Sequence, residues 1–205
     1  MSYTLLNETT GIILAGGQSS RMGRDKALLP LPGEQRLTFV SHLATLLSST
    51  CQDVLLVARD QDQANLYLPY LPSSVHLITD ATPHIGPLMG LYSGLRAMTT
   101  AYAVVTAVDM PFVQPALLEL LVAQARADTI IMPMVGGVPQ VLLALYPRSV
   151  LPLIEQRLQE GRRDPRSLLQ LAQVLPLEEA QLRTVDPQLR SFVNVNTPEE
   201  LSFYT

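Results

Sequence analysis

The chain has 205 residues, 47% hydrophobic and 16% charged, with a formal net charge of −4 and a single cysteine, Cys51. This composition is too apolar for a disordered protein, the negative charge argues against a general nucleic-acid binder, and one cysteine excludes an internal disulfide framework or a four-cysteine zinc site. No apolar run is long enough to span a membrane and residues 1–10 lack the features of a signal peptide, so we expect a cytoplasmic, single-domain protein over residues 1–205, with residues 1–10 as a flexible tail.

Short apolar runs alternate with longer amphipathic ones along the chain, which is the pattern of βαβ units. This alternation predicts an α/β fold with a doubly wound, mostly parallel sheet. The expected strands are residues 11–14, 53–58, 75–78, 103–108, 129–134, 140–145 and 192–195. The expected helices are residues 38–49, 61–70, 88–99, 115–126, 150–159 and 166–173, and a last helix that Thr197 caps and Pro198 begins.

A glycine-rich, cationic loop follows the first expected strand. It reads Gly16-Gly17-Gln18-Ser19-Ser20-Arg21-Met22-Gly23-Arg24-Asp25-Lys26. Consecutive glycine N–H groups can surround an anionic oxygen, and arginine and lysine add positive charge. The glycine spacing fits neither GxxxxGK[ST] nor GxGxxG. A surface loop that is basic by chance is the alternative, but ordinary βα connections are shorter. The loop therefore predicts a phosphate-binding site of another kind.

Two acidic residues also end expected strands. Asp109 follows the strand at 103–108, and Asp80 precedes a loop that contains Gly86-Pro87. Ligands of open α/β sheets bind outside the carboxyl ends of the strands, so these residues should lie at the same edge as the glycine loop. Asp109 there is suited to hold Mg²⁺ with substrate phosphates, or else caps a turn. Asp80 could bind a ligand oxygen, a ribose hydroxyl or the metal, or form only an Asx turn.

Two asparagines, Asn194 and Asn196, lie just before the expected last helix. Their amide oxygens could ligate a metal, hold a ligand oxygen or satisfy turn backbone. The chain has no GxSxG motif and Cys51 has no nearby histidine, so a covalent intermediate is not indicated. A phosphate loop beside a metal-binding carboxylate indicates phosphoryl or nucleotidyl transfer, which depends on positioning and charge neutralisation.

Four segments resemble the signatures of the MobA-type molybdenum cofactor guanylyltransferases, in the same order along residues 11–201. They are Leu14-Ala15-Gly16-Gly17-x-Ser19-x-Arg21-Met22-Gly23-x-Asp25-Lys26, Gly86-Pro87-Leu88-x-Gly90-Leu91, Val108-Asp109-Met110-Pro111 and Asn194-Val195-Asn196-Thr197-Pro198-Glu199-Glu200-Leu201. The resemblance implies a Rossmann-like nucleotidyltransferase fold. It also implies Mg²⁺-dependent transfer of GMP from GTP to the terminal phosphate of molybdopterin, with release of pyrophosphate.

The resemblance implies roles for individual residues as well. Lys26 and Asp109 would be catalytic together with Arg21, and Asp109 would hold Mg²⁺, with Asn194 and Asn196 as further candidate ligands. The GTP-binding residues would be Leu14, Ala15, Gly16, Gly17, Lys26, Asp80, Gly86, Pro87 and Asp109. Where relatives carry an asparagine that contacts GTP, this chain has Val57, so that contact is not transferred. The family also implies transient contacts with cofactor-insertion and acceptor proteins.

Three alternatives remain beside guanylyl transfer. A molybdopterin cytidylyltransferase is the nearest one, but such enzymes tend to have Leu-Ala-Ala-Gly where this chain has Leu14-Ala15-Gly16-Gly17. The second glycine leaves more room near the base, which favours a purine. Another small-molecule nucleotidyltransferase and a non-catalytic GTP-binding protein are the others. The combination of Asp109 with Lys26 distinguishes the last one, because a protein that only binds GTP needs no metal ligand opposite the leaving group. For the pterin phosphate, Gly161-Arg162-Arg163 is the candidate site, with a solvated cationic turn as the alternative.

Overall fold

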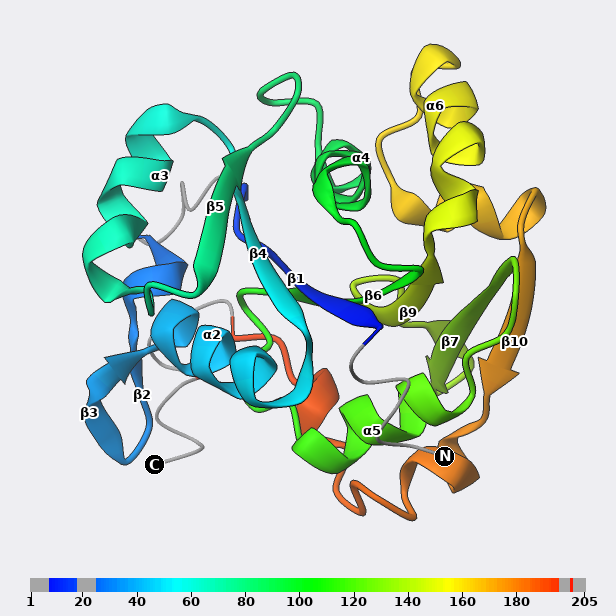
Figure 1. Cartoon of the computed structure of the whole chain (residues 1–205). Coiled ribbons are helices and arrows are strands. Elements are labelled where there is room, and N and C mark those ends of the chain that lie inside the picture. The colour runs from blue at the N-terminus through cyan, green and yellow to red at the C-terminus, as the bar shows by residue number, and fades with distance from the viewer. Residues whose placement is uncertain (1–7, 18–24, 196–199, 201–205) are drawn as a thin grey trace.

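The structure is a computed structural model that describes residues 8–17, 25–195 and 200 (Figure 1). Its centre is an eight-stranded sheet, beside which a two-stranded hairpin lies. The sheet contains β1 (Thr9–Leu14), β4 (Asp53–Ala58), β5 (Val75–Thr79), β6 (Tyr102–Ala107), β7 (Thr129–Val135), β8 (Val138–Pro139), β9 (Leu143–Pro147) and β10 (Gln173–Leu177), and the hairpin is β2 (Pro30–Leu31) with β3 (Glu34–Thr38).

The strand order in the sheet is β10-β7-β9-β6-β1-β4-β5, and β8 pairs with β7. Strand β1 pairs in parallel with both β4 and β6, and β4 pairs in parallel with β5. These four strands therefore bring their carboxyl ends to one edge of the sheet. Strand β9 runs antiparallel to β6 and β7, so the beginning of β9 lies at that edge instead.

Helices cover both faces of the sheet, as Figure 1 shows, with α2 and α5 on one side and α4 and α6 on the other. Neighbouring residues of β1 point to opposite faces: Ile13 packs in the core under α2 and α5, whereas Ile12 packs under α4. Both side chains are fully buried, which explains why this strand is apolar throughout. The α-helices are α2 (Phe39–Thr50), α3 (Gln61–Tyr67), α4 (Pro87–Ala97), α5 (Pro115–Ala123), α6 (Leu151–Gln159) and α7 (Glu179–Leu182).

Several expected elements differ from the structure at its edges. Thr9 and Thr10 are buried residues of β1, so they do not belong to a flexible tail. The segment expected as a strand at 192–195 is instead the end of a 3₁₀ helix, Arg190–Phe192, followed by irregular backbone. Instead of a ladder of strand hydrogen bonds, this segment makes one hydrogen bond to the residues after β6, from Val195 N to Asp109 O at 2.8 Å.

The second half of the chain also contains elements that the sequence pattern did not indicate. The expected helix at 166–173 is a 3₁₀ helix, Pro165–Gln170, and it is followed by strand β10, which contains Pro176. Proline is tolerated in β10 because β10 is the edge strand of the sheet. The strand expected at 140–145 begins only at Leu143, since residues 140–142 form a turn. The expected last helix lies almost entirely outside the described residues.

Two further expectations concern membrane-spanning segments and the single cysteine. No helix among the described residues is long and apolar enough to cross a membrane. Burial raises the pKa of Cys51 to about 11, which disfavours the reactive thiolate and agrees with the expectation that this cysteine is not a catalytic nucleophile.

Candidate active site

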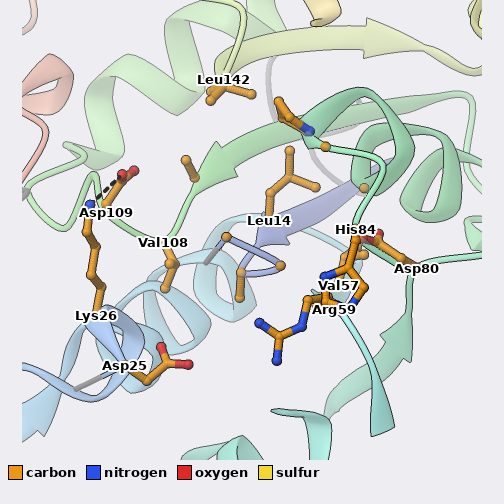
Figure 2. A pocket seen from close by; sticks show the side chains of 17 residues that line it. Leu14, Asp25, Lys26, Val57, Arg59, Asp80, His84, Val108, Asp109 and Leu142 are labelled. Carbon is orange, nitrogen blue, oxygen red and sulfur yellow. Dashed lines mark ion pairs between the residues drawn. The ribbon is translucent and has the colours of Figure 1, made fainter. Parts of the chain in front are cut away.

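The carboxyl ends of β1, β4, β5 and β6 border a pocket of about 460 Å³, which we call the nucleotide pocket after the ligand that the sequence predicts for its residues (Figure 2). All of the residues that the sequence predicted to bind GTP line it: Leu14, Ala15, Gly16, Gly17, Lys26, Asp80, Gly86, Pro87 and Asp109. The other lining residues are Asp25, Val57, Arg59, His84, Gly90, Ala107, Val108 and Leu142. Arg21 lies outside the described residues.

At one end of the pocket, Lys26 and Asp109 form an ion pair. Lys26 Nζ lies 3.5 Å from Asp109 Oδ2, and the two side chains are 21% and 29% exposed. Lys26 begins a 3₁₀ helix that ends the glycine loop, while Asp109 comes after β6. A partly exposed pair of this kind adds little to stability. Its main consequence is that a cation and a carboxylate are placed together where a phosphate chain with a metal could bind.

A buried hydrogen-bond network fixes the residue next to Lys26. The Oδ2 atom of Asp25 accepts hydrogen bonds from Tyr67 Oη at 2.8 Å and Gln63 Nε2 at 3.1 Å, and Oδ1 accepts one from Ala27 N at 3.0 Å. Tyr67 and Gln63 both come from α3 and are buried. Burial and the neighbouring Asp25 raise the pKa of Tyr67, so its hydroxyl stays a donor. The end of the glycine loop is thereby attached to α3.

At the other end of the pocket, Asp80 carries a buried oxygen without a partner. Its Oδ1 atom is inaccessible to solvent and has no hydrogen-bond partner among the described residues. Burial raises the pKa of Asp80 to about 7. The residues beside the carboxylate are glycines: a Cβ atom on Gly16 would lie 3.3 Å from Oδ2, and one on Gly90 would lie 3.5 Å from Oδ1. An unpaired buried acceptor is costly, so any donor that reached Oδ1 would relieve that cost.

Arg59 is a pocket residue that the sequence pattern did not single out. It comes directly after β4, and its guanidinium points into the pocket in Figure 2. The Val57 side chain, two residues earlier, is 1% exposed and packs into the core beneath α4. The signal that could have found Arg59 is its place: like Asp80 and Asp109, it is the polar residue at the carboxyl end of an apolar strand.

A second cavity of about 330 Å³ adjoins the nucleotide pocket, because Pro87 and Leu142 line both. Arg163, Arg166 and Asn194 also line this second cavity. The loop that carries Arg163 contacts the start of α4, where Leu88 N donates a hydrogen bond to Arg163 O at 3.0 Å. Asn194 thus lines the second cavity and not the nucleotide pocket, and Asn196 lies outside the described residues.

The fit of a metal ion depends on Asp109. Among the described residues, no group of three or more His, Cys, Asp or Glu side chains could hold a metal by itself. Magnesium, however, is commonly bound by one or two carboxylates together with substrate phosphates and water. Asp109, beside a cationic phosphate site, fits a cation that is completed by a bound nucleotide.

The sequence model of the family described as "MobA-like NTP transferase domain" matches residues 11–202. The chain belongs to this family. A molybdenum cofactor guanylyltransferase of Desulfosudis oleivorans is 34% identical to it over 199 residues, which cover 96% of this chain and 94% of the relative. The MobA-like family resemblance that four sequence segments indicated is therefore confirmed, and the chain is a nucleotidyltransferase.

Solved structures agree with this assignment. The molybdopterin-guanine dinucleotide biosynthesis protein A of Archaeoglobus fulgidus superposes on the MobA-like chain with a TM-score of 0.80 at 29% identity, covering 95% of each chain. A nucleotidyl transferase from Methanothermobacter superposes with a TM-score of 0.72 at 18% identity, covering 97% of this chain and 96% of that one. The second likeness shows the fold alone. Together with the sheet order, these structures confirm the predicted α/β nucleotidyltransferase fold.

Proposed function

We propose that this MobA-like protein transfers GMP from GTP to the terminal phosphate of molybdopterin and releases pyrophosphate. The observation that carries the proposal is one pocket with a cation–carboxylate pair, Lys26 and Asp109, at one end and at the other end Asp80, a carboxylate with one buried, unpaired oxygen. The relatives named as guanylyltransferases support it. We also propose that residues 1–205 form one cytoplasmic domain that binds cofactor-insertion and acceptor proteins transiently.

The pocket has the length of a nucleotide. Neighbouring strands lie about 4.8 Å apart, so the three spacings from β6 to β5 span about 14 Å. The triphosphate would lie at the β6 end, where Lys26 can donate to its oxygens, whereas Gly16 lies beside Asp80 toward the other end. The base would lie at the β5 end. There guanine offers two adjacent donors, N1–H and the N2 amino group, to the two oxygens of the Asp80 carboxylate.

In the transfer step, a terminal phosphate oxygen of molybdopterin attacks the α-phosphorus of GTP. The bond from the α-phosphorus to the oxygen that bridges the α- and β-phosphates breaks, and pyrophosphate leaves with that oxygen. Lys26 would leave Asp109 to stabilise the negative charge on the departing pyrophosphate, and we retain Arg21 in the same role. Asp109 would hold Mg²⁺, which when bound neutralises phosphate oxygens as a Lewis acid. Asp25, held by Tyr67 and Gln63, keeps the neighbouring Lys26 in place.

The second cavity is where we place molybdopterin. Arg163 and Arg166 line it and offer the charge that a phosphate needs, which supports the expected role of the loop at 161–163. Because Pro87 and Leu142 border both cavities, a phosphate in the second one would approach the nucleotide from the side of α4. The Asn194 amide would then contact the acceptor rather than the metal.

The test is to incubate the protein with Mg²⁺, molybdopterin and each nucleoside triphosphate in turn and to identify the dinucleotide formed. We expect the guanine dinucleotide and pyrophosphate with GTP. The Asp109→Ala variant should lose transfer but keep its fold, and Lys26→Ala should bind GTP more weakly by calorimetry. Product with CTP alone would identify a cytidylyltransferase, and GTP binding without pyrophosphate release would identify a non-catalytic GTP-binding protein.

A further inference from the structure

The loop that follows β6 is attached to a segment late in the chain, residues 186–195, which we call the C-terminal brace. Val195 N donates a hydrogen bond to Asp109 O at 2.8 Å, and Gln114 N donates one to Ser191 Oγ at 3.0 Å. The loop that joins β6 to α5 is therefore bound to the brace at both of its ends. Figure 1 shows the brace, in orange to red, beside α5.

A buried carboxylate organises the brace. Asp186 is 4% exposed, and its Oδ1 and Oδ2 atoms accept hydrogen bonds from Arg190 N at 3.0 Å and Ser191 N at 2.8 Å. These two backbone donors satisfy the carboxylate and begin the 3₁₀ helix Arg190–Phe192. The Arg190 guanidinium also lies 5.5 Å from the centroid of the Phe112 ring in the loop. Asp186 thereby fixes the residues of the brace that contact the loop.

The turn inside the brace has strained backbone. Leu189 has a φ of 53°, in the left-handed region that side chains other than glycine rarely adopt, and its side chain is buried. Such a conformation persists only where the surrounding structure determines it. Here the hydrogen bonds of Asp186 do so, because they join residues on both sides of Leu189, and Leu189 N itself donates to Asp186 O at 2.9 Å. The brace is thus held in one defined conformation.

The brace acts on the residue that would hold the metal. Asp186 and Ser191 are buried and line neither the nucleotide pocket nor the second cavity, whereas Asp109 is 29% exposed at the pocket wall. A functional side chain is placed accurately only where other contacts fix its backbone. We propose that Asp186 and Ser191 are positioning residues that fix the backbone of Asp109 and so place its carboxylate for Mg²⁺. This inference rests on the proposed function, which assigns Mg²⁺ to Asp109.

The test measures how much Mg²⁺ strengthens GTP binding, as the ratio of the calorimetric Kd in EDTA to the Kd in excess Mg²⁺. The acceptor is left out, because Asn194 of the brace lines the second cavity and would add an effect of its own. The ratio should be about 10–100 in the wild type and about one in Asp109→Ala. In Ser191→Ala and Asp186→Asn it should fall about three- to tenfold, with little change of the Kd in EDTA.

Thr100→Ala is the matched control. It also removes a buried hydrogen bond, between Thr100 Oγ1 and Thr10 Oγ1 at 2.7 Å, but near the amino end of β1 at the opposite edge of the sheet. It should lower the Tm and keep the wild-type ratio. Amide hydrogen exchange gives a second measurement that needs no ligand. The N–H groups of Gln114 and Val195 should exchange faster in Asp186→Asn than in the wild type or in Thr100→Ala.

An equal loss of GTP affinity in Mg²⁺ and in EDTA would overturn the inference, since a segment that only stabilises the pocket behaves in that way. Faster exchange with an unchanged ratio would also overturn it. Failure of the proposed function differs from both: if the wild type binds CTP in preference to GTP, guanylyl transfer is wrong, and the same ratios measured with CTP then decide the role of the brace. Thermal unfolding followed by circular dichroism would establish that each variant is folded in the binding experiment.

Discussion

Replacing Asp80 by asparagine should stabilise the protein at neutral and alkaline pH. The carboxyl has an ordinary pKa of 3.8, and burial raises it to about 7. The native state therefore binds more protons than the unfolded state between these two values, and the free energy of unfolding falls as the pH rises through this window. The penalty is absent below pH 3.8 and complete above about pH 7. An amide of the same shape carries no charge and escapes it.

The size of the effect can be worked out from the shift. About three pKa units at 1.36 kcal/mol each set a limit of about 4 kcal/mol. Water enters the nucleotide pocket and screens the charge, so we expect Asp80→Asn to gain about 1–2 kcal/mol at pH 8. The same variant should lose its preference for GTP over ITP, because an amide cannot accept from both guanine donors. Stability would then be gained where substrate recognition is lost.

Urea unfolding of the wild type and Asp80→Asn at a series of pH values from 4 to 8 measures this difference. The acid end is an internal control, since both proteins carry a neutral group there and should have nearly equal free energies of unfolding. The difference should grow with pH and level off above about pH 7. A difference that is constant across the series, or a wild type that is the more stable protein at pH 8, would refute the reasoning that Asp80 is a desolvated carboxylate.

Two further substitutions test how the pocket is supported. Tyr67→Phe removes the hydrogen bond to Asp25, so in steady-state assays it should raise the KM for GTP with little change in kcat, and it should cost about 1–2 kcal/mol of stability. Tyr146→Phe is the control. It loses a comparable buried hydrogen bond, from its hydroxyl to Val141 O, and should leave the KM for GTP unchanged. Gly94→Ala would place its Cβ 2.8 Å from Ile12 Cγ2, so we expect the free energy of unfolding, measured by thermal unfolding, to fall by about 1–2 kcal/mol. Gly90→Ala changes the same helix, but its Cβ would have contacts of 3.4 Å and longer, so this variant should be as stable as the wild type or more stable. Equal KM values in Tyr67→Phe and Tyr146→Phe, or equal stabilities of the two glycine variants, would contradict these accounts.

The central part of the fold could be predicted because its signals are local. Strands β1, β4 and β6 are buried on both faces, so each appears in the sequence as a continuous apolar run. The rule that ligands bind at the carboxyl ends of parallel strands then brought the glycine loop, Asp80 and Asp109 to one edge. Because that rule depends only on strand direction, it held although several element boundaries were shifted.

The errors occur where long-range pairing decides the structure. Strand β10 contains a proline and exists because its backbone pairs with β7, more than forty positions earlier in the chain. The apolar residues near Val195 have a strand-like pattern, but their neighbour is a single backbone oxygen of Asp109. The hairpin of β2 and β3 is likewise a pairing that the apolar pattern did not mark. No local pattern distinguishes these cases.

The prediction of the site from the sequence was incomplete for the same reason, because the missing contacts join residues that are far apart in the chain. Tyr67 and Gln63 are separated from Asp25 by about forty residues, so their hydrogen bonds to it become visible only when α3 packs beside the glycine loop. Arg59 looked like an ordinary residue before a helix cap. Its place on the pocket wall follows only from the position of β4 between β1 and β5 in the sheet.

The reversed direction of β9 affects how this family can diversify. The nucleotide pocket is formed mainly by residues at the carboxyl ends of β1, β4, β5 and β6, whereas the second cavity is formed by the turn before β9 and by the loop before the 3₁₀ helix Pro165–Gln170. The shared wall consists of Pro87 and Leu142. Substitutions of Gln140 and Val141, in the turn before β9, can therefore change the second cavity without altering a residue that lines the nucleotide pocket. With the acceptor in the second cavity, as proposed above, gene duplicates could acquire new acceptors without first losing their nucleotide.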